Sequence, residues 1–167
     1  DSYKETHANA KIDPLPNVWT GTWRDSRSFN PEGPQPENGL TGQIFTVNGP
    51  ASNALIVPAD YKQLRFWRNT AITSLQTGQS KTFATGTLGY EWDEDLDNGF
   101  RPPGLIRLSS STYNVNTYIL DQGSNYGQGI ATHHVTLYRA SSGALVFGAG
   151  TINWPWGLAL SHDLNSP

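Results

Sequence analysis

Short hydrophobic runs separated by turn-forming residues occupy most of the chain after residue 41. Each run is rich in β-branched or aromatic residues, and Gly, Pro, Asn or Ser lies between one run and the next, which is typical of strands and their turns. The runs cover residues 42–47, 54–57, 82–85, 87–92, 105–108, 113–120, 133–139 and 144–152. The pattern predicts a mainly β body at residues 42–167, with a mixed or antiparallel sheet and a few short helices.

Three local signals refine this picture. The loop 140–143 contains Gly143 and joins two β-rich runs, so it predicts a hairpin. Asn48-Gly49-Pro50 predicts a turn between the runs 42–47 and 54–57. Pro58, followed by apolar residues spaced by three, predicts a short helix over 58–69, with a strand at 64–68 as the alternative.

Residues 1–41 have a different character. Prolines recur through 13–16 and 30–36, which prevents long helices and central strands. Trp19 and Trp23 are the large apolar residues between these two stretches, and we expect them to dock the segment onto the body. The sequence therefore predicts an irregular, Pro- and Gly-rich arm that covers another domain or a neighbouring chain.

Composition narrows the possible functions. The chain has 167 residues, 0 Cys and a net charge of -3, which excludes cysteine chemistry and gives no basic field for nucleic acid. No stretch approaches the ~18 apolar residues of a membrane span. The chain has 0 Met, so we expect a processed N terminus or a fragment. We expect a secreted, extracellular protein, although the absence of cysteine also suits a cytoplasmic one.

The most unusual segment is acidic, with carboxylates at Glu91, Asp93, Glu94, Asp95 and Asp97. Crowded carboxylates repel one another unless solvent, a cation or basic residues compensate them. In an extended segment Glu91, Asp93, Asp95 and Asp97 share one face. Asp93-x-Asp95-x-Asp97 also resembles the opening of a calcium loop, which predicts a calcium-type site at these three aspartates.

The calcium match stops after its opening. Gly99 comes one place late, and Gly104 stands where such a loop has a bidentate Glu, so the segment is not an EF-hand. The alternative is a solvated acidic loop that forms ion pairs with Arg101 and Arg107.

Two further clusters have both a chemical and a structural interpretation. His133 and His134 are adjacent, so on a strand they point to opposite faces and cannot bind one ion together. His134 is a candidate binding residue, with a surface histidine as the alternative.

The segment 65–68 mixes arginines with Phe66 and Trp67, which suits binding of a sugar or, more simply, core packing. The sequence has no nucleophile-elbow, phosphate-loop or zinc-protease motif.

Several stretches together resemble the C-terminal part of the N,N-dimethylformamidase large (β) subunit-like family, and the resemblance covers nearly the whole chain. They are Tyr3-Lys4-Glu5-Thr6-His7-Ala8-Asn9-Ala10-Lys11, Thr20-Gly21-Thr22-Trp23-Arg24-Asp25, Leu64-Arg65-Phe66-Trp67-Arg68-Asn69-Thr70, Gly89-Tyr90-Glu91-Trp92-Asp93 and the run 143–154.

This resemblance implies a fold, a cofactor and partners. The family's catalytic region is similar to a class I glutamine-amidotransferase-like α/β domain, and this segment would supply its later strands. The characterised enzyme is an iron amidohydrolase whose metal is held by two tyrosines and a glutamate, in motifs upstream of Tyr3. The resemblance therefore implies a partner, either the upstream portion of the same protein or another copy.

By the same resemblance, Glu91 is the one functional position that carries over, as an acid near the metal or a proton shuttle. Tyr90 and Trp92 depart from the enzyme's pattern, and Trp92 is retained as a candidate binding residue. We therefore expect the C-terminal portion of a metal-dependent amide hydrolase whose metal ligands lie outside this chain. The alternative is a non-catalytic extracellular β module that binds carbohydrate or assembles with other chains, with calcium as a stabiliser.

Overall fold

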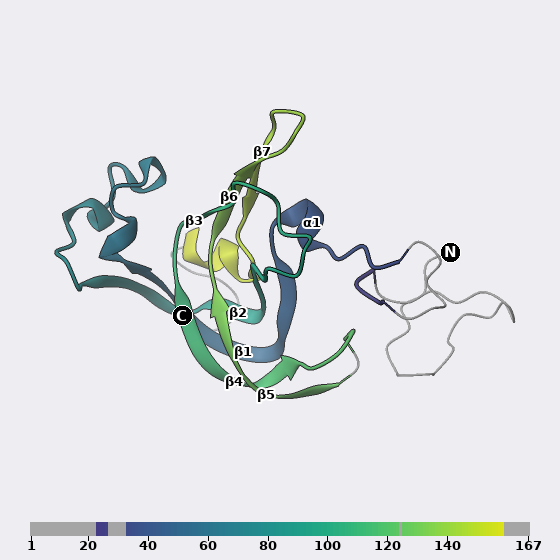
Figure 1. Ribbon diagram of the computed structural model, residues 1–167. Coiled ribbons are helices and arrows are strands. Elements are labelled where there is room, and N and C mark those ends of the chain that lie inside the picture. The colour runs from purple at the N-terminus through teal and green to yellow at the C-terminus, as the bar shows by residue number, and fades with distance from the viewer. Residues whose placement is uncertain (1–22, 27–32, 124, 159–167) are drawn as a thin grey trace, which may run out of the picture.

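The computed structural model describes residues 23–26, 33–123 and 125–158, which form two antiparallel sheets (Figure 1). The first sheet has the order β2-β1-β4-β5, and the second has the order β3-β6-β7. The strands of the first sheet are β1 (Ile44–Pro58), β2 (Ser80–Glu94), β4 (Ser111–Ile119) and β5 (Tyr126–His133). The second sheet contains β3 (Ile106–Arg107), β6 (Thr136–Arg139) and β7 (Leu145–Gly148).

Helical structure in the described residues is limited to short segments. They are α1 (Asn38–Thr41) and the 3-10 turns η1 (Ala59–Tyr61), η2 (Arg65–Trp67), η3 (Ala71–Ser74) and η4 (Trp154–Leu158). The predicted mainly β class is confirmed, and every strand pair is antiparallel. The glutamine-amidotransferase-like α/β arrangement is not confirmed.

The predicted turn at Asn48-Gly49-Pro50 is wrong. β1 runs through these residues as one long strand paired with β2, and the pairing shifts register between Val47 and Ala51. The irregularity absorbs the proline within the strand, because a bulge leaves residues out of the ladder. The hairpin turn comes later, through the excursion 59–79, which Figure 1 shows at the opposite end of β1 from α1.

Two separate 3-10 turns, η1 and η2, replace the single helix predicted over 58–69, and η3 follows them. Leu64 and Arg68 have extended ψ angles of 130° and 143°, so each interrupts helical propagation. Trp67 nevertheless anchors the excursion, because its indole Nε1 donates a 2.8 Å hydrogen bond to the Leu108 carbonyl. Phe66 stacks on Phe147, so both aromatics of this segment pack against other parts of the chain.

The hydrophobic core lies between the long strands and the second sheet. Its buried members include Val47 and Leu55 from β1, Leu88 and Trp92 from β2, and Val135. Trp92 and Leu88 lie on the inward side of β2, where alternate residues of a strand share one face. Because Leu88 and Trp92 face the core, the alternate residues Glu91 and Asp93 face outward.

The docking expected of Trp23 is wrong, because its side chain is 75% exposed. Arg24 makes the contact instead, since its guanidinium pairs with Glu37 and donates a 2.7 Å hydrogen bond to the Phe45 carbonyl. Trp19 lies outside the described residues. The expected division into an arm at 1–41 and a body at 42–167 stays a prediction.

Candidate functional site

The acidic segment divides into three environments where β2 ends at Glu94. Within the strand, Glu91 and Asp93 point to the outer face, and the buried residues Trp92 and Glu94 point inward. Beyond the strand, Asp95 turns into the protein and is 3% exposed. Asp97 is 69% exposed and pairs with Arg101 at 3.0 Å. Strand alternation predicted the shared face of Glu91 and Asp93, and the end of the strand explains why Asp95 leaves it.

Glu91 and Asp93 line an open hollow of about 410 Å³. One wall is the segment 150–152, which runs beside the end of β2: the Asp93 amide donates to the Gly150 carbonyl at 2.8 Å, and Trp92 bridges Thr151. Phe45 from β1 lies on the other side. The hollow thus brings two carboxylates, a threonine and apolar surface together.

The pKa of Asp93 is raised from 3.8 to about 6, mainly by burial and in smaller part by the nearby charges of Glu37 and Glu91. Arg24 opposes this effect but does not cancel it. Among the described residues, no hydrogen bond reaches the Asp93 carboxylate to stabilise its ionised form. Asp93 is therefore partly protonated near neutral pH, with Glu91 beside it as a second carboxylate.

Asp95 forms the centre of a second polar cluster. Its Oδ1 lies 2.5 Å from His134 Nδ1, and its Oδ2 accepts a 2.7 Å hydrogen bond from Arg107 Nε. Arg101 adds a longer ion pair, with Nη1 3.9 Å from the same Oδ2. Burial opposes ionisation, but the hydrogen bonds from His134 and Arg107 hold the pKa of Asp95 below its ordinary value.

The surface interpretation of the two histidines is wrong, because both are buried. His133 ends β5 and faces inward, where its Nε2 lies 2.9 Å from the Ala149 carbonyl and its ring packs edge-on to Trp92. His134 follows the strand and turns the other way, to Asp95. Burial lowers the pKa of His133 from 6.5 to about 4, so this side chain is neutral at neutral pH.

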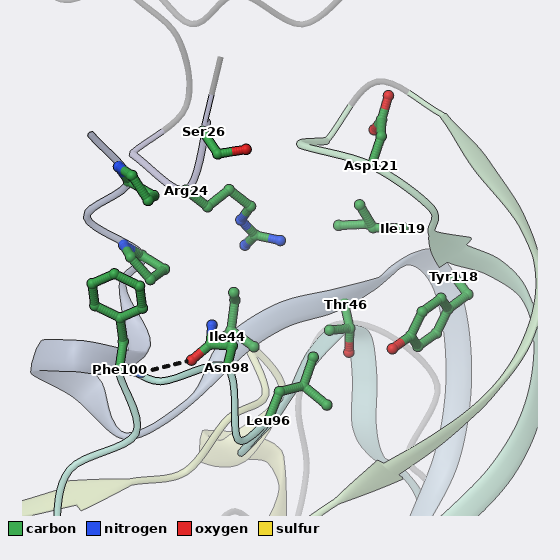
Figure 2. Close-up of a pocket in the computed structure, with 12 residues that line it drawn as sticks. Arg24, Ser26, Ile44, Thr46, Leu96, Asn98, Phe100, Tyr118, Ile119 and Asp121 are labelled. Carbon is green, nitrogen blue, oxygen red and sulfur yellow. Dashed lines mark hydrogen bonds between the residues drawn. The ribbon is translucent and has the colours of Figure 1, made fainter. Parts of the chain in front are cut away.

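Another hollow, of about 330 Å³, lies between the segment 23–26 and the first sheet (Figure 2). Figure 2 shows Arg24 extending into it and the hydroxyl groups of Thr46 and Tyr118 near its floor. Burial and the neighbouring Glu94 raise the pKa of Tyr118 to about 12. The buried Thr46 Oγ1 and Glu94 Oε2 have no hydrogen-bond partner among the described residues.

The described residues contain no group of three or more His, Asp or Glu side chains placed to hold a metal ion. Asp93 lines one hollow, Asp95 is engaged by His134 and Arg107, and Asp97 pairs with Arg101. The calcium-type site at these three aspartates thus stays a prediction without geometric support. The ion pairs of the alternative interpretation, with Arg101 and Arg107, are present in the structure.

Sequence reasoning identified Glu91, Asp93 and His134 as chemical candidates, and the structure places Glu91 with Asp93 and His134 with Asp95. Trp92, the other candidate binding residue, is fully buried in the core. Tyr61 was missed; it lines a hollow with Arg101 and Arg107 although it is distant in sequence. No spacing signal links Tyr61 to these arginines, so only the fold reveals the association.

Comparison with protein families identifies a match. The family model described as N,N-dimethylformamidase beta subunit-like, C-terminal, matches residues 1–166. Neither the curated proteins nor the solved structures contain a match. None of the helices in the described ranges is long and apolar enough to cross a membrane. The match spans the chain almost from end to end, and the chain belongs to the family of C-terminal regions of N,N-dimethylformamidase β subunit-like proteins.

Proposed function

We propose that this chain is the C-terminal part of an amide (C–N bond) hydrolase, in which Glu91 and Asp93 transfer protons beside a catalytic centre completed by residues outside the chain. Family membership supports the reaction class. The observation that carries the role of these residues is the pairing of two carboxylates in one hollow, one of them with a pKa of about 6.

Amide hydrolysis has a proton requirement that suits such a pair. Water adds to the carbonyl carbon, and the C–N bond then breaks with its electrons passing to nitrogen. The nitrogen must receive a proton as it leaves, because an unprotonated amide anion is a very poor leaving group. A carboxylic acid with a pKa near 6 is an effective donor at neutral pH, since it is both populated and acidic enough to release its proton.

Asp93 is the proton donor in this proposal and Glu91 is its neighbour. The charge of Glu91 helps to keep the proton on Asp93, and after the transfer Glu91 can relay a replacement proton from solvent. Phe45 and Ile152 provide apolar walls, which favour a small, weakly polar substrate over a charged one.

The described residues contain no group of three His, Asp or Glu side chains placed to hold a metal ion, and the resemblance puts the family's iron ligands upstream of Tyr3. The proposal therefore leaves metal binding to the upstream portion of the protein or to a second copy, which the chain would contact. The proton transfers assigned to Glu91 and Asp93 do not require this chain to supply a metal ligand.

The test is hydrolysis of N,N-dimethylformamide by the full-length protein that carries this chain. Glu91→Gln and Asp93→Asn are each expected to lower kcat by about 10²–10⁴-fold with little change in KM, because a positioned acid acts mainly in the transition state. Asp97→Asn is the matched control, since Asp97 is exposed outside the hollow, and its kcat is expected to stay within about twofold.

Two outcomes would contradict the proposal. An inactive wild-type protein would favour the non-catalytic module that assembles with other chains. Full activity in Asp93→Asn would retain the hydrolase and remove the proton-transfer role from this hollow. The pH profile gives an independent check, because kcat/KM is expected to decline above pH ~6 as Asp93 loses its proton.

A further inference from the structure

We propose that the hollow bordered by Tyr61, Arg101, Leu105 and Arg107 is a binding site for a small carboxylate anion. The hollow measures about 360 Å³, and the buried Asp95 forms its base. It is separate from the Glu91 and Asp93 hollow, so the proposal does not depend on the proposed hydrolase.

Arg107 presents the geometry that a carboxylate recognises. Its Nε is occupied by Asp95 Oδ2 at 2.7 Å, and its side chain is 45% exposed. Among the described residues, its two terminal nitrogens have no hydrogen-bond partner. These nitrogens form the end-on fork of the guanidinium group, which matches the two oxygens of a planar carboxylate.

Asp95 and His134 hold the Arg107 guanidinium group in place. Asp95 cannot swing away from Arg107, because its other oxygen lies 2.5 Å from His134 Nδ1 and the whole side chain is 3% exposed. His134 is itself buried, so the chain of contacts ends in the protein interior. A guanidinium group held in this way loses little conformational freedom when a ligand binds.

The charges around the hollow leave room for an anion despite the presence of Asp95. Two guanidinium groups converge on a single oxygen, Asp95 Oδ2, with Arg107 at 2.7 Å and Arg101 at 3.9 Å. One buried carboxylate cannot neutralise both cations. Asp97 also pairs with Arg101, but it is 69% exposed and its charge is screened by water. Asp60 also acts on the neighbouring Tyr61, so the charges around the hollow nearly balance, and the unpaired Arg107 fork is the group that would receive an anion.

Tyr61 and Leu105 define the remaining borders. Tyr61 lines one edge, with its hydroxyl hydrogen-bonded to Ser110, and Leu105 supplies an apolar wall. A carboxylate with a short apolar tail would place its oxygens at Arg107 and its tail against Leu105. A tetrahedral phosphate carries more charge and no apolar part, so it would use the fork but not the wall.

The experiment is an NMR titration of the ¹⁵N-labelled chain with sodium acetate, with sodium chloride exchanged so that ionic strength stays constant. Saturable shifts of the Arg107 Nε–H signal and of the Tyr61 amide are expected. Arg107→Lys keeps the charge and removes the fork, so the Kd is expected to rise about tenfold or more. Arg139→Lys is the matched control, because Arg139 ends β6 outside the hollow and its guanidinium donates to the Gly143 carbonyl.

The control and the wild type should give the same Kd, and a dispersed spectrum confirms that each variant is folded. Arg101→Lys provides a second variant, for which a smaller loss is expected. Linear shifts without saturation, or an unchanged Kd in Arg107→Lys, would overturn the proposal. Tighter binding of inorganic phosphate than of acetate under the same conditions would overturn the carboxylate assignment.

Discussion

Asp95 and His134 lie 39 positions apart in the sequence and meet in the protein interior, with His134 Nδ1 2.5 Å from Asp95 Oδ1. Asp95 follows the end of β2, and His134 follows the end of β5. Their contact joins the C-terminal ends of β2 and β5, the two edge strands of the first sheet. Arg107, at the end of β3 in the second sheet, binds the other Asp95 oxygen, so one carboxylate links both sheets.

Asp95→Asn is expected to destabilise the protein by about 1–3 kcal/mol, because it removes a buried carboxylate that contacts His134 and pairs with the Arg107 guanidinium. Asp97→Asn should change stability by less than about 0.5 kcal/mol, since Asp97 is exposed. Urea denaturation of the two variants at pH 7 measures the difference. Equal stability would show that the Asp95 contacts contribute nothing.

The β7 segment offers a purely steric test. A Cβ atom added at Gly148 would lie 2.2 Å from Gln43 Oε1 and 2.5 Å from Thr136 Oγ1, both in buried side chains. Gly148→Ala should therefore cost about 1–3 kcal/mol through overpacking. Gly39→Ala is the control, because its nearest neighbour would be an ordinary 3.7 Å away. Thermal denaturation should show a lower Tm for the first variant alone.

The elements that the sequence predicted well are those set by local pattern. The hairpin around Gly143 and the shared face of Glu91 and Asp93 follow from alternation and turn chemistry, and both are present. Asn48-Gly49-Pro50 has the same local chemistry as a turn, but pairing along β1 and β2 overrides it.

The Asp95, His134 and Arg107 cluster depends on where strands end and how two sheets pack. The sequence suggested Arg107 as an ion-pair partner, but it suggested a surface position for His134. A histidine becomes buried here because a carboxylate inside the protein satisfies its Nδ1. That condition arises from tertiary packing, and no short-range spacing encodes it.

Asp93→Asn is expected to increase stability at pH 7 while it removes activity. Most Asp93 side chains are ionised at this pH in a site whose burial raises the pKa to about 6, so the charge costs about 3 kcal/mol that a neutral amide avoids. Guanidinium denaturation of Asp93→Asn against Asp97→Asn measures the gain. A site that is destabilising and necessary for activity indicates selection for function. A variant that is less stable than the wild type would contradict the conclusion that the ionised Asp93 carboxylate destabilises the folded protein.

The pH dependence of stability should reveal His133 and Asp93 as opposing groups. His133 has a folded pKa of about 4 against 6.5 unfolded, so as the pH falls through this window the unfolded state binds the extra proton and stability decreases. Asp93 has a folded pKa of about 6 against 3.8 unfolded, so acidification over that range adds a proton to the folded state and increases stability.

The two windows overlap between pH ~4 and 6, so the wild-type free energy of unfolding should be nearly flat there. Asp93→Asn removes one of the two groups, and its stability should fall by about 1 kcal/mol per pH unit as the pH drops from 6 to 4. Below pH 4, protonation of Asp95, whose pKa is lowered, should destabilise both proteins. Urea titrations at intervals of pH measure the free energy of unfolding of both proteins. Parallel curves of this free energy against pH would mean that the pKa of Asp93 is the same in the folded and unfolded states. A flat curve for the variant would mean that His133 does not contribute to the pH dependence.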